Sequence, residues 1–80
     1  MEATIRKPLL TDAQLKVLML ICEDKDTEEM ATLLNLSPRT IEYRRITLKD
    51  KFDVKTIGGL VYKAYKQGFV STEITEKRST

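Results

Sequence analysis

The dipeptide Ser37-Pro38 constrains the fold of this chain more than any other local feature. Serine is a preferred N-cap of helices. Proline is favoured at the first helical position, because the N–H that it lacks would have no intrahelical partner there. These two residues predict a helix that begins at Pro38, and its apolar periodicity continues to about Phe52.

The predicted helix 38–52 has two contrasting sides. Ile41, Leu48 and Phe52 are separated by seven and four residues and fall on one side, which is the pattern of a buried stripe. Such a helix can pack on a scaffold through that side and offer hydrogen-bonding groups on the other. The residues of the opposite side are Arg39, Glu42, Tyr43, Ile46 and Lys49.

A first helix is predicted to follow Thr11. Thr11 and Gln14 form a T-x-x-Q capping box, in which each side chain binds a free backbone N–H of the other residue. The helical spacing of its apolar residues predicts a buried stripe. That stripe consists of Leu15, Leu18, Met19 and Cys22, and is widened by Val17 and Ile21.

A second, short helix is predicted between residues 27 and 35. Thr27 is the expected N-cap, because two glutamates follow it in the first turn, where the helix dipole favours acids. Asn35 can end the helix because asparagine tolerates the left-handed conformation. The predicted apolar face consists of Met30, Ala31, Leu33 and Leu34.

A fourth helix is predicted from Thr56, its N-cap, to Gly68, which stands at the usual position just beyond a helix end. Phe69 and Val70 can fold back on it. Gly58-Gly59 either delays the start of this helix or allows close approach of another backbone. The polar segments 1–8 and 71–80 lack apolar periodicity and are predicted to be flexible tails around one domain, 9–70.

The composition excludes several classes of function. The chain has 80 residues, enough for one domain, and contains no histidine, so histidine-assisted nucleophiles and histidine-containing zinc sites are absent. Cys22 is the single cysteine, which rules out an internal disulfide and favours a reducing compartment such as the cytoplasm. There is no apolar run long enough to span a membrane and no signal-peptide pattern. We expect no enzyme activity, no metal site, no cofactor and no membrane partner.

Charge is distributed unevenly along the chain. Residues 1–36 carry four basic and seven acidic side chains, whereas residues 37–66 carry eight basic and three acidic ones, a net charge of +5. A concentration of positive charge on one part of a small domain favours a polyanionic partner. The competing interpretation is a solvated face that is simply rich in lysine and arginine.

The arrangement of a short second helix, a tight turn and a capped third helix is typical of a helix-turn-helix. The sequence resembles the LuxR/FixJ-type (GerE-like) DNA-binding domain over about residues 10–70, because several of its motifs occur together in order. These motifs are Leu10-Thr11, the segments TEEMATLL at 27–34 and LSPRTIE at 36–42, then Arg45, Leu48, Lys51-Phe52, Val54, Leu60-Val61, Ala64 and Gly68-Phe69-Val70. The fold class expected from this resemblance is an all-α, four-helix LuxR-type helix-turn-helix domain.

The resemblance implies that residues 38–52 form a recognition helix in the major groove of duplex DNA. It implies that Glu42, Tyr43 and Ile46 face base edges, that Thr40, Arg45 and Lys51 approach phosphates, and that the domain dimerises through its fourth helix. Many family members have glycine where this chain has Asp53, and some have a base-reading lysine where it has Ile46. The expected DNA-binding residues are Ser37, Arg39, Thr40, Glu42, Tyr43, Arg44, Arg45, Ile46, Lys49 and Lys51.

The resulting hypothesis is a bacterial transcription regulator, or the output domain of a two-component response regulator, that binds DNA as a homodimer and contacts RNA polymerase. Two alternatives remain open from the sequence. One is the promoter-reading region of a sigma factor, which has a similar helix-turn-helix. The other is a protein-interaction module that kept the fold but lost DNA binding, which the acidic first half of the chain would suit.

Overall fold

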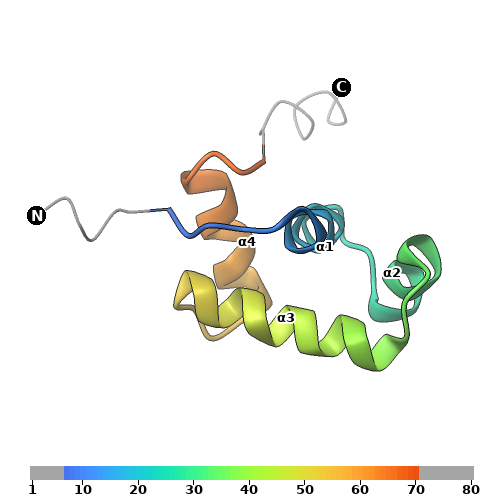
Figure 1. Ribbon diagram of the computed structural model, residues 1–80. Helices are drawn as coiled ribbons and strands as arrows, with labels where there is room; N and C mark the ends of the chain where they lie inside the picture. Colours follow the sequence, from blue (N-terminus) through green and yellow to red (C-terminus); the bar gives the residue numbers. More distant parts are fainter. Residues whose placement is uncertain (1–6, 71–80) are drawn as a thin grey trace, which may run out of the picture.

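The computed structural model describes residues 7–70, and within this range the chain forms four helices and no strand (Figure 1). The all-α prediction is therefore confirmed, and the third helix has the predicted bounds. Figure 1 shows α3 along the lower edge of the domain, with α4, α1 and α2 above it. The helices are α1 (Asp12–Cys22), α2 (Thr27–Leu34), α3 (Pro38–Phe52) and α4 (Ile57–Lys66).

Side-chain caps begin all four helices. The predicted capping box of α1 is present, with the Gln14 N–H donating to Thr11 Oγ1 at 3.1 Å and the Thr11 N–H donating to Gln14 Oε1 at 3.0 Å. Ser37 caps α3 through the Thr40 N–H at 3.1 Å. Thr56 caps α4 through the Gly59 N–H at 3.0 Å.

The predicted cap of α2 was wrong by one residue. Asp26, and not Thr27, is the N-cap: its carboxylate accepts from the Glu29 N–H at 2.8 Å, and the Glu29 side chain accepts from the Asp26 N–H at 2.9 Å. Aspartate competes well with threonine at this position and completes a reciprocal box with Glu29. Thr27 becomes the first helical residue, and its hydroxyl is left to bind elsewhere.

All four helices end in the same way, at a residue with a left-handed backbone. These residues are Asp24, Asn35, Asp53 and Gly68, with φ angles of 67°, 57°, 57° and 84°. After each helix, two backbone N–H groups turn back to carbonyls of its last turn, as when the Phe69 N–H donates to the Ala64 carbonyl at 2.9 Å. This is the Schellman arrangement, and it confirms Asn35 and Gly68 as predicted helix ends.

The core lies between α3 and the other three helices, and α3 contacts each of them. Ile41, Leu48 and Phe52 are buried, as their spacing predicts. Phe52 also meets Phe69 edge to face, with ring centroids 5.4 Å apart. The other buried hydrophobic residues are Val17, Leu18, Ile21, Met30, Ala31, Leu60 and Ala64.

Two predicted core residues are instead exposed. Met19 is 43% exposed because the buried residues of α1 are Val17, Leu18 and Ile21, and Met19 lies beside them on the helix. Leu33 is 60% exposed because the short α2 meets the core through Met30 and Ala31. In both helices the sequence prediction included in the buried stripe an apolar residue that lies next to that stripe and is exposed.

The segment before α1 packs along the domain. The Lys51 ammonium donates to the Leu9 carbonyl at 2.6 Å, and the Lys7 ammonium lies 4.8 Å from the centre of the Phe69 ring. The predicted flexible tails, 1–8 and 71–80, lie outside the described residues except for 7 and 8. No helix within 7–70 is long and apolar enough to cross a membrane.

Candidate nucleic-acid interface

One side of α3 is exposed, although Glu42 on that side is hydrogen-bonded to Thr27 of α2. Because its buried residues face the core, the residues on the far side of the helix face away from the core; α3 itself runs along the lower edge of the domain in Figure 1. We call Arg39, Glu42, Tyr43 and Ile46 the outer stripe; all four are exposed, and their spacings of three and four residues place them on one side of the helix. Tyr43 is 68% exposed and Ile46 54%. Unpaired aromatic and aliphatic side chains next to an arginine form a surface that can meet another molecule.

The charge of α3 is strongly positive. It contains five basic side chains against two acidic ones, Glu42 and Asp50. Arg39 and Lys51 are exposed, whereas Arg44, Arg45 and Lys49 are half-buried. The positive charge is therefore presented along both flanks of the outer stripe, where it can neutralise phosphates.

The N-terminus of α3 adds uncharged hydrogen-bonding groups. Ser37 and Thr40 each have a hydroxyl there, and the two oxygens lie 2.9 Å apart within hydrogen-bonding distance. Ser37 also accepts from the Thr40 N–H. A helix N-terminus with hydroxyls and a favourable dipole suits an anion such as a phosphate, which was the role expected for Thr40.

Glu42 and Arg45 are joined through a residue of α2. The Arg45 guanidinium donates from Nη1 to the Thr27 hydroxyl oxygen at 2.7 Å, and that hydroxyl donates to Glu42 Oε2 at 2.9 Å. Thr27 therefore connects two expected site residues. It was missed as a site residue because it was taken for a cap; the Asp26-x-x-Glu29 spacing is the sequence signal that could have corrected this assignment.

Two further expected site residues lie on the opposite flank of α3. Lys51 binds the Leu9 carbonyl, so a phosphate would have to share this ammonium or displace the carbonyl. Arg44 is half-buried, and its Nε is buried without a hydrogen-bond partner among residues 7–70. Of the ten expected residues, four therefore form the exposed outer stripe, while Arg45 on one flank is bonded to α2 and Lys51 on the other flank is bonded to the segment before α1.

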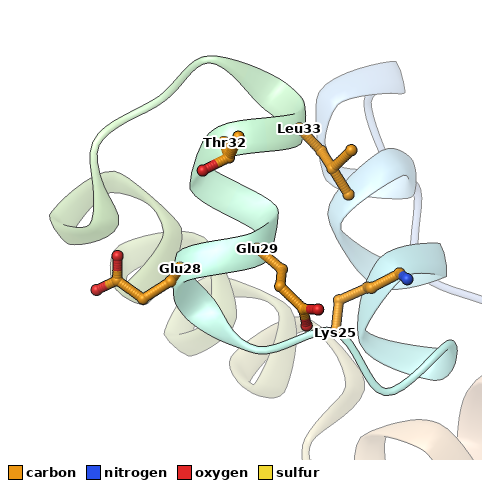
Figure 2. A pocket seen from close by; sticks show the side chains of 5 residues that line it. All are labelled: Lys25, Glu28, Glu29, Thr32 and Leu33. Carbon is orange, nitrogen blue, oxygen red and sulfur yellow. The ribbon is translucent and has the colours of Figure 1, made fainter.

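A shallow hollow occurs on a different part of the surface, at α2 and the turn before it. Figure 2 shows Lys25, Glu28, Glu29, Thr32 and Leu33 around it. Two carboxylates at its rim would repel a polyanion. No three potential metal ligands lie together within residues 7–70. The outer stripe of α3, and not this hollow, is the candidate site.

The comparisons agree with this geometry. The family described as bacterial regulatory proteins, luxR family, matches residues 8–64. Among curated proteins, none matches the chain significantly.

Two solved structures are similar to the chain. One is VqmA from Vibrio cholera in a complex with a ligand and DNA, with a TM-score of 0.75, 26% identity and 80% of this chain covered. The other is a phage VqmA in a complex with DPO, with a TM-score of 0.73, 26% identity and 84% of this chain covered. This chain spans only 28% and 32% of the length of those two chains. Since the family match covers most of the sequence and the four-helix fold agrees with it, the chain belongs to the luxR family of bacterial regulatory proteins.

Proposed function

We propose that this chain is a sequence-specific DNA-binding transcription regulator, or the DNA-binding output portion of a longer one such as a response regulator. The observation that carries the proposal is the outer stripe of α3, which is exposed, lies on a basic helix and is rigidly backed by the core. A helix of this form fits the major groove of B-DNA. The family and the DNA complex of one structural neighbour support the same function.

In this proposal the contacts divide into two kinds. Tyr43 and Ile46 face base edges, where an aliphatic side chain can pack on the methyl group of thymine. Arg39 and Lys49, with the hydroxyls of Ser37 and Thr40, contact the phosphates on either side. Phosphate contacts fix the position of the helix, and base contacts select the sequence.

Dimerisation through α4 is part of the proposal. Leu60 and Ala64 bury one side of this helix, which leaves Gly58 and Tyr62 exposed on its outer side, while Val61 packs against the edge of the core. Tyr62 is 61% exposed, with the Lys66 ammonium 5.8 Å from its ring centre. A small residue next to an aromatic one can let two helices approach closely. A dimer would place two copies of α3 in successive turns of the major groove. We expect such a dimer to act in the cytoplasm and to contact RNA polymerase through the surface that faces away from the DNA.

The test is selection of bound sequences from random duplexes, followed by fluorescence anisotropy on the selected duplex over a range of salt. We expect the logarithm of the binding constant to fall with the logarithm of salt by about 0.9 per phosphate contact. A two-part selected site would support the dimer, and Tyr62→Ala should weaken cooperative binding without affecting a single half-site. Failure to enrich any sequence, together with salt-independent binding, would refute the proposal. A stoichiometric protein complex without DNA affinity would instead establish an interaction module.

A further inference from the structure

The hydroxyl of Thr27 sits between two side chains of α3. It accepts from Arg45 Nη1 at 2.7 Å and donates to Glu42 Oε2 at 2.9 Å. We call this chain of two hydrogen bonds the Thr27 bridge. Thr27 is available for it because Asp26 caps α2, so the threonine hydroxyl is not needed at the helix N-terminus.

The bridge fixes a side chain that would otherwise be free to move. Glu42 is exposed and belongs to the outer stripe, next to Arg39 and Tyr43 along the helix. An unrestrained carboxylate beside DNA would turn away from the phosphates, because like charges repel. Its hydrogen bond to Thr27 uses Oε2 and holds the group in one position, and the half-buried Arg45 on the same hydroxyl offsets the negative charge.

A carboxylate held in this way has a definite chemical preference. Oε1 can still accept a hydrogen bond. In the major groove, cytosine offers a donor through its exocyclic amino group, and a carboxylate side chain accepts from it. Guanine and thymine offer acceptors at the corresponding groove edge, which a carboxylate cannot bind, and the amino group of adenine stands next to the N7 acceptor, which repels a carboxylate.

We infer that Thr27, through the Thr27 bridge, is a positioning residue that fixes Glu42 as the acceptor for a cytosine amino group at one position of the DNA site. This inference rests on the proposed function of the outer stripe. It assigns sequence selection to a residue of α2 that lies outside the recognition helix. Because the threonine hydroxyl has no charge, its loss should change base preference and leave phosphate binding as it is.

The test compares Thr27→Val, which keeps the shape and removes the hydroxyl, with Thr27→Ser, which keeps the hydroxyl. Each protein is titrated against the selected duplex and against duplexes with the cytosine replaced. We expect the wild type to prefer cytosine by roughly ten- to hundred-fold, the range of one good base contact. Thr27→Val should reduce this preference to a few-fold, Thr27→Ser should restore most of it, and Glu42→Ala should abolish it. The salt dependence should be the same for wild type, Thr27→Val and Thr27→Ser.

Thr32→Val is the matched control, because Thr32 is an exposed threonine of α2 at the hollow of Figure 2, away from α3. It should keep the full cytosine preference. Circular dichroism would verify that every variant is helical before its binding is interpreted. If Thr27→Val keeps the wild-type preference, or loses affinity equally for all duplexes, the inference is overturned while the proposed function stands. If the wild type itself binds no duplex, the proposed function has failed first.

Discussion

Gly59 and Val54 are packed so closely that a side chain on Gly59 would crowd the side chain of Val54. A Cβ atom on Gly59 would lie 3.3 Å from the Val54 Cβ and 3.4 Å from its Cγ1. Val54 cannot easily yield, because its N–H is bonded to the Lys49 carbonyl at 3.0 Å and its side chain packs against the core. Of the two effects predicted for Gly58-Gly59, a delayed helix start is wrong, because α4 begins at Ile57; the close contact at Gly59 is with the side chain of Val54 and not with another backbone.

The two adjacent glycines should respond oppositely to alanine. Gly58→Ala meets only the Thr56 hydroxyl oxygen at 3.9 Å, so it should gain up to about 1 kcal/mol from the better helix propensity of alanine. Gly59→Ala should lose that gain and destabilise the domain by about 1 kcal/mol through crowding at Val54. Urea denaturation of the two variants measures the difference directly. Equal stabilisation by both would show that Val54 moves aside at little cost.

The end of α3 is another place where stability can be raised. Asp53 has a φ of 57°, a conformation that glycine adopts without steric cost, and its carboxylate stands at the negative end of the helix dipole. Asp53→Gly should therefore stabilise the domain by about 0.5–1 kcal/mol. Asp53→Asn keeps a side chain that tolerates this backbone and removes only the charge, so it separates the steric contribution from the electrostatic one.

Gly68→Ala, at the end of α4 and at a φ of 84°, should destabilise the domain by a similar amount.

Local signals predicted most of the fold, because helix starts and ends depend on a few neighbouring residues. Thr11, Ser37, Thr56 and Gly68 have the predicted roles at helix ends. Two candidate cap residues within the same helical turn were harder to distinguish from the sequence. The Asp26 cap was missed because Thr27 has nearly the same capping propensity, and only the reciprocal pair with Glu29 decides between them.

The candidate site was predictable in its composition but not in its connections. Periodicity identifies the exposed side of α3, since the buried side must face the core. Periodicity contains no information on how α2 and α3 cross, and this crossing brings Thr27 next to Glu42 although they are 15 positions apart in the sequence. The bond from Lys51 to the Leu9 carbonyl spans 42 positions and is equally invisible to local rules.

Cys22 should react slowly with alkylating reagents. Its thiol is half-buried, and burial, followed by the nearby Glu23 carboxylate, raises its pKa from 9.0 to about 11. Since the thiolate is the reactive form, its population at pH 8 is about one hundredth of that of an ordinary cysteine. The rate of iodoacetamide modification should therefore be about 100-fold lower than for a short cysteine peptide and rise steadily up to about pH 11. In urea, where the thiol is exposed, the two rates should converge; a fast reaction of the native protein at pH 8 would contradict this expectation.

Arg39 and Tyr43 should contribute to DNA binding in different ways, although they are neighbours on the outer stripe. Arg39→Ala removes an exposed charge, so it should weaken binding to all duplexes by a similar factor and reduce the salt slope by about 1. Tyr43→Ala removes an uncharged aromatic ring, so the salt slope should stay constant while the discrimination between the selected duplex and single-base variants falls by roughly 1–3 kcal/mol. Arg45→Ala should combine both effects, because its guanidinium is charged and also holds Thr27. Competition anisotropy at two or more salt concentrations measures both quantities for each variant. If Tyr43→Ala lowers the affinity for every duplex equally, Tyr43 does not face the bases, and α3 must enter the groove along a different side from the outer stripe.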